Sequence, residues 1–131
     1  MDSQKTLVFL HGWGVSSEVF KPLYPFLGEN FQIYALDLPG FGQTPIEKLM
    51  TLKDYAEFVH KFLKENNIKE PIIIGHSFGG AVAIKLALLY PNNISKLILV
   101  SASAIRHPRY KIMLINKIAG FTKLFLPEQL R

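Results

Sequence analysis

The stretch PIIIGHSFGGAVAIKLALLYP, residues 71–91, changes its pattern at the segment GHSFGG. Before that segment, residues 72–74 form a short apolar run that is typical of a strand buried on both faces. After it, residues 78–90 are apolar on almost every side, which predicts a helix packed deeply against a sheet. The segment between them therefore predicts a sharp turn from strand to helix, with Ser77 at its centre.

The five residues GHSFG fit the pattern GxSxG at such a turn. A serine projected from a turn of this kind has a strained backbone and an accessible hydroxyl, as a nucleophile requires. Strand and helix then pass so closely that the positions two before and two after the serine must lack side chains, and Gly75 and Gly79 meet that need. The nucleophile is the interpretation that we prefer for Ser77. The alternative is a turn that only joins the two elements.

Further apolar segments alternate with helical patterns along the chain. The predicted strands cover residues 6–10, 31–37, 71–75 and 94–102, and the predicted helices cover residues 17–27, 51–67 and 78–90. The second helix begins with TLKD, in which Thr51 and Asp54 can form a capping box. This alternation predicts an α/β fold, a doubly wound and mostly parallel sheet with helices on both faces. Ligands of such sheets bind beyond the carboxyl ends of the strands.

Two of the segments that follow predicted strands can serve an acyl-transfer site. HGWG, residues 11–14, follows the first strand, and such a site needs two backbone donors aimed at the substrate oxyanion. The amides of Trp13 and Phe78 are the candidates, although Trp13 can also be read as a core residue. We interpret DLPGFG, residues 37–42, as a tight turn that orders the loop after the second strand.

Composition and spacing argue against several other function classes. The chain has no cysteine, which excludes disulfides, thiol catalysis and thiolate metal sites. No phosphate-binding GK[ST] loop or complete GxGxxG fingerprint follows a strand. The net charge of +5 arises wholly in residues 105–131, because residues 1–104 carry nine lysines and nine acidic residues, so we expect no nucleic-acid partner. No apolar run reaches the roughly 20 residues of a membrane span, and no secretory signal starts the chain, so a cytoplasmic protein is expected and a membrane partner is not.

The motifs HG-x-G, D-x-x-G-x-G and G-H-S-x-G, in this order, resemble the α/β-hydrolase family. Within the family, HGWG and DLPGFG look most like the pimeloyl-acyl-carrier-protein methyl ester esterases. The resemblance implies a sheet whose strands lie in the order second, first, third, fourth. It also implies a serine hydrolase that acts on a small carboxylic ester or acyl substrate through an acyl-enzyme, without cofactor or metal. By this resemblance Ser77 is the nucleophile, the amides of Trp13 and Phe78 form the oxyanion hole, and Gly75 and Gly79 are the elbow glycines.

The family orders its catalytic triad as Ser, then Asp or Glu, then His. After Ser77, the only acidic residue is Glu128 and the only histidine is His107, which no neighbouring carboxylate accompanies. We therefore expect that the sequence corresponds to the N-terminal half of a hydrolase. Residues 1–104 would form part of its core, and residues 105–131 would begin a helical cap. The alternative is a non-catalytic fragment or binding module of the same fold.

The remaining histidines are predicted to have structural or solvated positions. His11 should brace its loop, and His76 should pack beside the turn. His60 should face solvent on the polar side of its helix. The apolar residues of the C-terminal segment share a helical spacing with lysines opposite, so a membrane-surface helix is a second interpretation of the expected cap. The substrate's identity and the oligomeric state stay open.

Overall fold

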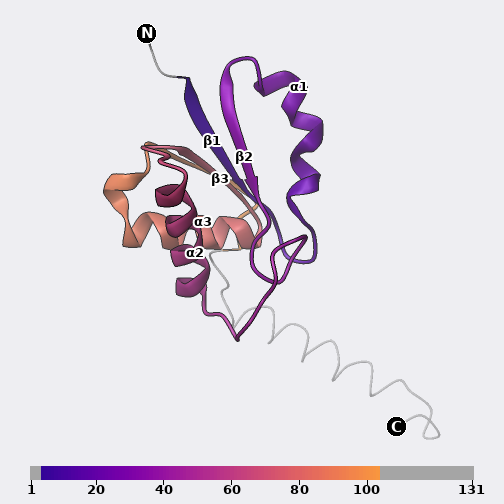
Figure 1. Ribbon diagram of the computed structural model, residues 1–131, viewed down its shortest axis with the longest axis vertical. Helices are drawn as coiled ribbons and strands as arrows, with labels where there is room; N and C mark the ends of the chain where they lie inside the picture. The colour runs from indigo at the N-terminus through magenta and orange to yellow at the C-terminus, as the bar shows by residue number, and fades with distance from the viewer. Residues whose placement is uncertain (1–3, 104–131) are drawn as a thin grey trace, which may run out of the picture.

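Four parallel strands form the sheet in the computed structural model, which describes residues 4–103. They are β1 (Lys5–Leu10), β2 (Phe31–Leu36), β3 (Ile72–His76) and β4 (Lys96–Val100). Their order is β2-β1-β3-β4, and every neighbouring pair is parallel (Figure 1). This confirms the strands and the order expected from the sequence. The two central strands, β1 and β3, therefore end side by side, with Leu10 paired to Gly75.

The helical elements agree with the sequence except at the first one and at a short 3-10 helix, η2, that was not predicted. They are η1 (Ser17–Leu23), α1 (Tyr24–Leu27), α2 (Leu52–Glu65), α3 (Phe78–Leu89) and η2 (Pro91–Asn93). The first predicted helix is a 3-10 helix, η1, followed by the single α-helical turn of α1. Pro22 and Pro25 have no amide hydrogen, so a continuous α-helix would lack two of its backbone hydrogen bonds.

The predicted capping box begins α2. The Thr51 hydroxyl accepts a hydrogen bond from the Asp54 amide at 3.2 Å, and the Asp54 carboxylate accepts one from the Thr51 amide at 2.7 Å. Tyr55, Val59 and Leu63 then recur at helical spacing and are buried. The cap therefore fixes where α2 begins, and this spacing determines which side of the helix faces the sheet.

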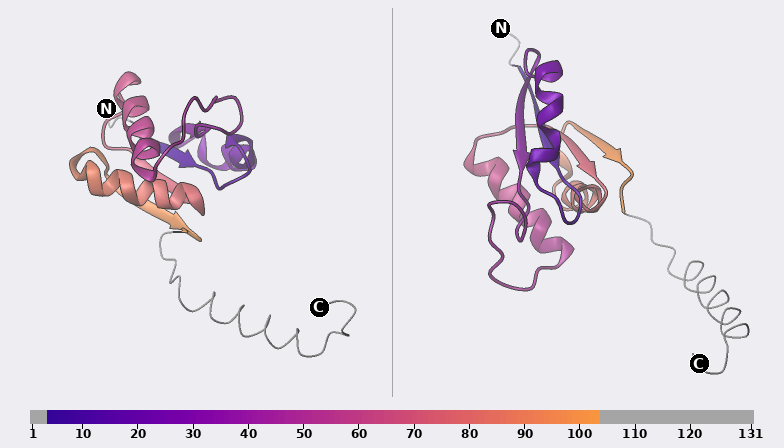
Figure 2. Two further views of the ribbon diagram at one scale, coloured as in Figure 1. Left: turned by 90° about the horizontal axis from the view of Figure 1, so that it is seen from below. Right: turned by 90° about the vertical axis from the view of Figure 1, so that its right-hand side faces the viewer.

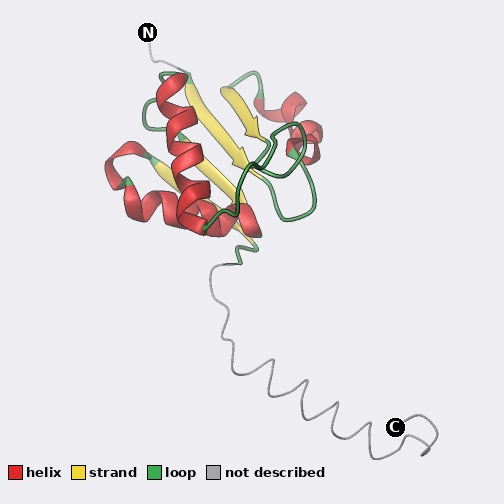
Figure 3. Cartoon of the chain, turned by 60° about the horizontal axis from the view of Figure 1, so that its bottom comes forward, coloured by secondary structure: helices red, strands yellow, loops and turns green. Residues whose placement is uncertain are grey.

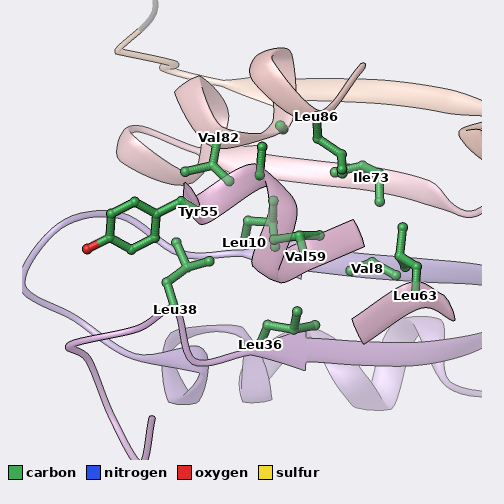
Figure 4. Packing of buried hydrophobic residues seen from close by; sticks show 12 residues of the cluster. Val8, Leu10, Leu36, Leu38, Tyr55, Val59, Leu63, Ile73, Val82 and Leu86 are labelled. Atoms are coloured by element: carbon green, nitrogen blue, oxygen red, sulfur yellow. The ribbon is translucent and has the colours of Figure 1, made fainter. Parts of the chain in front are cut away.

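Helices cover both faces of the sheet, as predicted, and α1 and α2 lie on opposite sides of β1 and β2 (Figure 2). Residues from the strands, α2 and α3 form the larger core cluster (Figure 4). Its buried members are Val8, Leu10, Leu36, Leu38, Tyr55, Ala56, Val59, Leu63, Ile73, Val82, Ala83 and Leu86. On the other face, Phe20 of η1 packs against Phe9 with ring centroids 4.8 Å apart. The central strands β1 and β3 are thus apolar on both faces because they contribute residues to both clusters.

His60 is only partly exposed, whereas its helix position predicts a solvated side chain. Its ring stacks on Tyr90 with centroids 3.6 Å apart and planes 5° apart, and within residues 4–103 its buried Nδ1 atom has no hydrogen-bond partner. Burial, with a smaller contribution from the charge of Lys64, lowers the pKa of His60 below its ordinary value. The helical pattern of α2 alone places the His60 ring at the surface, but Tyr90, the C-cap of α3, packs against it.

The expected cap of residues 105–131, including His107, lies outside the described residues. In the part of the chain that the structure describes, no helix has both the length and the apolar character needed to cross a membrane.

Candidate functional site

Loops from neighbouring strands meet at the carboxyl end of the sheet. The segments that follow β1 and β2 gather at the arrowhead end of these strands (Figure 3), and β3 leads directly into α3 at the same end. The parallel order of the strands produces this arrangement, because it brings every strand's carboxyl end to one edge. The candidate site residues Trp13, Ser77 and Phe78 all belong to these segments.

Ser77 occupies the single position between β3 and α3. Its backbone angles are φ 49° and ψ −113°, a conformation that non-glycine residues rarely adopt. Its carbonyl oxygen accepts hydrogen bonds from the amides of Gly80 at 3.0 Å and Ala81 at 3.3 Å, which continue into the helix. The chain thus passes from strand to helix within one residue, and the sharp turn predicted at Ser77 is confirmed.

The two predicted elbow glycines are positions where no side chain fits. A Cβ atom at Gly75 would lie 2.6 Å from the Gly79 carbonyl oxygen and 2.7 Å from the Gly80 Cα atom. A Cβ atom at Gly79 would overlap the backbone of Leu10 and lie 2.6 Å from the His11 carbonyl oxygen. The contacted atoms belong to backbone and have little freedom to move, so any larger residue would force β3, α3 and the end of β1 apart.

The loop after β1 lies directly against the Ser77 turn. A Cβ atom at Gly12 would be 3.1 Å from Nδ1 of His76 and 3.4 Å from Cβ of Ser77. Within residues 4–103, the Trp13 amide makes no backbone hydrogen bond. The Phe78 amide is in the first turn of α3, where amides have no partner inside the helix. Two amides without backbone partners therefore come from the two segments that meet at Ser77.

An aromatic cluster stands beside this turn. Trp13 is 70% exposed, so it is not a core residue, and its ring contacts Phe41 and Phe78 edge to face at centroid distances of 5.0 and 5.3 Å. The Tyr55 ring also contacts Phe78 edge to face, with a centroid distance of 5.0 Å, and its hydroxyl donates a hydrogen bond to the Pro39 carbonyl at 3.2 Å. Sequence patterns did not reveal this cluster, because its members come from four separate segments.

His11 and Asp37 hold the surrounding loops in place. The Nδ1 atom of the buried His11 lies 2.7 Å from the Gly12 carbonyl, and its Nε2 atom accepts a hydrogen bond from the Leu38 amide at 3.0 Å. This pairing makes Nδ1 the protonated nitrogen and confirms the bracing role predicted for His11. It also means that both ring nitrogens already have backbone partners.

Asp37 fixes the DLPGFG turn, as the sequence predicts. Its carboxylate accepts hydrogen bonds from the amides of Ser17 at 2.7 Å and Gln43 at 2.8 Å. Partial burial opposes its ionisation, but these two amides, with smaller contributions from the Ser17 hydroxyl and from His11, outweigh that effect, and the pKa of Asp37 lies below its ordinary value. The carboxylate therefore ties the start of η1 to the loop after β2.

Ser103 is the hydrogen-bond partner of the Ser77 side chain, and we did not expect it from the sequence. The two Oγ atoms lie 3.1 Å apart. Within residues 4–103, no histidine or carboxylate contacts the Ser77 hydroxyl, and no group of three metal-binding side chains is present. The one available signal was that SASAIRH follows a predicted strand, which places Ser103 at the correct edge of the sheet.

Comparisons with known proteins place this geometry in a family. A family model described as alpha/beta hydrolase fold matches residues 5–129. The pimeloyl-[acyl-carrier protein] methyl ester esterase of Pseudoalteromonas atlantica is 42% identical over 103 residues, which are 77% of this chain and 38% of that protein. The corresponding esterase of Proteus mirabilis is 39% identical over 97 residues, which are 74% of this chain and 36% of that protein. The chain thus spans less than two fifths of the length of these relatives.

Solved structures agree. An esterase from a marine microorganism has a TM-score of 0.71 and 33% identity, covering 75% of this chain and 38% of that one. A 2-hydroxy-6-oxo-6-phenylhexa-2,4-dienoate hydrolase from Rhodococcus has a TM-score of 0.70 and 29% identity, covering 76% of this chain and 38% of that one. The motifs, the strand order and these matches point to one conclusion: the chain belongs to the α/β-hydrolase fold family, as its sequence motifs indicate.

Proposed function

We propose that Ser77 is the nucleophile of a serine hydrolase that cleaves carboxylic esters through an acyl-enzyme. The observation that carries this proposal is the strained backbone of Ser77, at φ 49° and ψ −113°, in a turn whose close packing requires glycine at positions 75 and 79. A fold maintains such a conformation at a cost of about 1–3 kcal/mol, and functional sites are where such costs concentrate.

The reaction follows the usual course of acyl transfer. A base removes the Ser77 proton, and Oγ attacks the ester carbonyl carbon, whose oxygen takes the negative charge. The amides of Trp13 and Phe78 would donate hydrogen bonds to this oxyanion, and the N-terminus of α3 favours the same charge. The alcohol leaves with the proton from the base, and water then hydrolyses the acyl-enzyme. No step requires a cofactor or metal.

We propose that the proton acceptor comes from outside residues 4–103. The ring nitrogens of His11 both have backbone partners, and His60 stacks on Tyr90 at the far end of α3. His76 is exposed and makes no hydrogen bond to Ser77. The described residues therefore offer the nucleophile and the two donors, and we propose that a histidine and a carboxylate beyond them complete the site.

The substrate class follows from the relatives and the aromatic cluster. Two of the relatives above are named as methyl ester esterases and one solved structure as an esterase, which supports a small carboxylic ester or acyl substrate. The rings of Trp13 and Phe41 contact each other and lie close to the ring of Phe78, the residue after Ser77, and such a cluster suits an apolar acyl chain. We further propose a cytoplasmic enzyme without a nucleic-acid or membrane partner, whose residues 105–131 begin a cap over the site.

A second candidate is a non-catalytic binding module of the same fold. One observation favours it: the Ser77 hydroxyl pairs with Ser103, and no base contacts it within residues 4–103. Such a module would keep the aromatic cluster and bind acyl chains without cleaving them.

Slow, site-specific phosphonylation tests the proposal in the 131-residue chain. Loss of the base of a serine triad lowers the rate by about a millionfold, so a fluorophosphonate should react over days rather than seconds. We expect peptide mass spectrometry to find the adduct at Ser77. Ser77→Ala should remove it, and Ser95→Ala, a change of a serine at the far end of β4, should leave it. Equal modification of several serines would contradict a nucleophile at Ser77. Labelling within seconds would contradict the expectation that the 131-residue chain does not supply the base.

A further inference from the structure

The short segment of residues 100–103 makes hydrogen bonds to all three polar atoms of Ser77. The Ser77 amide donates to the Val100 carbonyl at 3.0 Å, and the Ser103 amide donates to the Ser77 carbonyl at 3.0 Å. The two hydroxyl oxygens, Oγ of Ser77 and Oγ of Ser103, lie 3.1 Å apart. One segment, 23 to 26 residues further along the chain, thus surrounds the strained residue.

The end of β4 brings this segment into place. Val100 is paired with His76, the last residue of β3, so the two strands end together. Ser101 then has φ 47°, which turns the chain toward the start of α3. Ala102 packs against Gly80 so closely that a Cβ atom at Gly80 would lie 2.5 Å from the Ala102 Cβ atom. The hydroxyl of Ser103 therefore reaches Ser77 through a specific path and not through a loosely placed loop.

The backbone and the side chain of Ser77 are held by different groups. A conformation as strained as that of Ser77 persists only where surrounding contacts determine it, and its two backbone hydrogen bonds to residues 100 and 103 supply such contacts. They leave the χ1 angle of Ser77 free, however, and a serine side chain has three staggered positions available. Within residues 4–103, Ser103 is the side chain that hydrogen-bonds the hydroxyl.

We propose that Ser103 is a positioning residue, whose hydroxyl selects the χ1 rotamer in which Ser77 presents its oxygen at the open end of the sheet. The amide of Ser103 would be supplied by almost any residue at this position, so the hydroxyl alone carries the specific role. The consequence for reactivity rests on the proposed function of Ser77, whereas the hydrogen bond itself does not.

Three variants of Ser103 separate the hydroxyl from the shape of the side chain. Ser103→Thr keeps the hydroxyl, Ser103→Val has the shape of threonine without it, and Ser103→Ala removes it with the least bulk. A hydrogen bond of this kind contributes about three- to tenfold in an equilibrium. We expect Ser103→Val and Ser103→Ala to slow the fluorophosphonate reaction of Ser77 by about three- to tenfold. Ser103→Thr should stay within about twofold of the unchanged chain. Equal rates for the threonine and valine variants would overturn the proposal.

A second measurement decides the matter without relying on the reactivity of Ser77. Urea unfolding of Ser77→Ala, Ser103→Ala and the double variant forms a thermodynamic cycle. Each variant changes the equilibrium constant of unfolding by some factor. If the hydroxyls interact, the factor for the double variant should be at least about threefold smaller than the product of the factors for the two single variants. Additive changes would overturn the proposal. Coupled stabilities with equal labelling rates would do so too, because Ser103 would then stabilise the turn without positioning its hydroxyl. If Ser77 is not labelled in any variant, the proposed function fails, and the cycle alone decides whether Ser103 holds the side chain.

Discussion

Among the single residues of the site, Ser77 has the strained backbone on which the proposed function rests. Its positive φ angle suits glycine, which has no Cβ atom, and disfavours alanine as much as serine. Ser77→Gly and Ser77→Ala both remove the hydroxyl, so the comparison between them isolates the backbone. We expect Ser77→Gly to be more stable than Ser77→Ala by about 1 kcal/mol in urea unfolding, because relief of strain exceeds the entropy cost of glycine. If the alanine variant is equally or more stable, the turn is not strained as described.

Ser77 also shows what sequence can and cannot reveal about single residues. The turn and its glycines were predictable, because sterics allow few residue types where a strand and a helix pass so closely. The partner hydroxyl of Ser103 was not, because it depends on where β4 ends and on a positive φ angle at Ser101, which is not a glycine. The stacking of His60 on Tyr90 escaped prediction for a similar reason, since Tyr90 does not belong to the helix that carries His60.

At the scale of elements, the strands and their order followed from sequence patterns and family resemblance. Long apolar segments predict buried strands well, because both faces of a parallel sheet are covered. The element between residues 17 and 27 was the exception, since two prolines shift a helical segment from α to 3-10 geometry. The aromatic cluster of Trp13, Phe41, Phe78 and Tyr55 needed the fold itself, because it forms only when the loops after β1 and β2 meet α2 and α3.

Asp37 joins two of these elements, and its lowered pKa gives a prediction about pH. The folded state binds its proton more weakly than the unfolded chain, whose reference pKa is 3.8. The stabilisation is therefore complete well above that value and is lost as the pH falls below it. We expect the stability of the unchanged chain in urea to decrease between about pH 5 and pH 3, and Asp37→Asn to flatten this decrease. An unchanged acid dependence in Asp37→Asn would show that the carboxylate does not tie the loops together.

At the scale of the whole molecule, the two edges of the sheet decide how the chain behaves in solution. Within residues 4–103, β2 and β4 each pair on one side only, and β4 exposes Ile98, Leu99 and Val100. Unpaired apolar edges of this kind favour pairing with other chains. We expect the 131-residue chain to self-associate at tens of micromolar, as measured by size-exclusion chromatography with light scattering.

A charged residue on the exposed strand β4 provides a variant that tests whether this edge causes the self-association. Ile98→Lys should shift the chain toward monomer, because a lysine there disfavours strand pairing between copies. A sharp monomeric peak for the unchanged chain, together with cooperative unfolding, would show that the edge strands do not drive self-association.

If Ser77 is a nucleophile, a complete hydrolase that contains it should form an acyl-enzyme, and a burst experiment detects this intermediate. Residues 1–103 would be fused to the remaining part of the Pseudoalteromonas atlantica relative, of which this chain covers 38%. After folding is verified by cooperative unfolding, the fusion is mixed with a p-nitrophenyl ester. A nucleophile at Ser77 predicts a rapid release of about one equivalent of p-nitrophenol, an acyl group on Ser77 by peptide mass spectrometry, and loss of both in Ser77→Ala. A folded fusion that gives no burst, or a burst that survives Ser77→Ala, would contradict it.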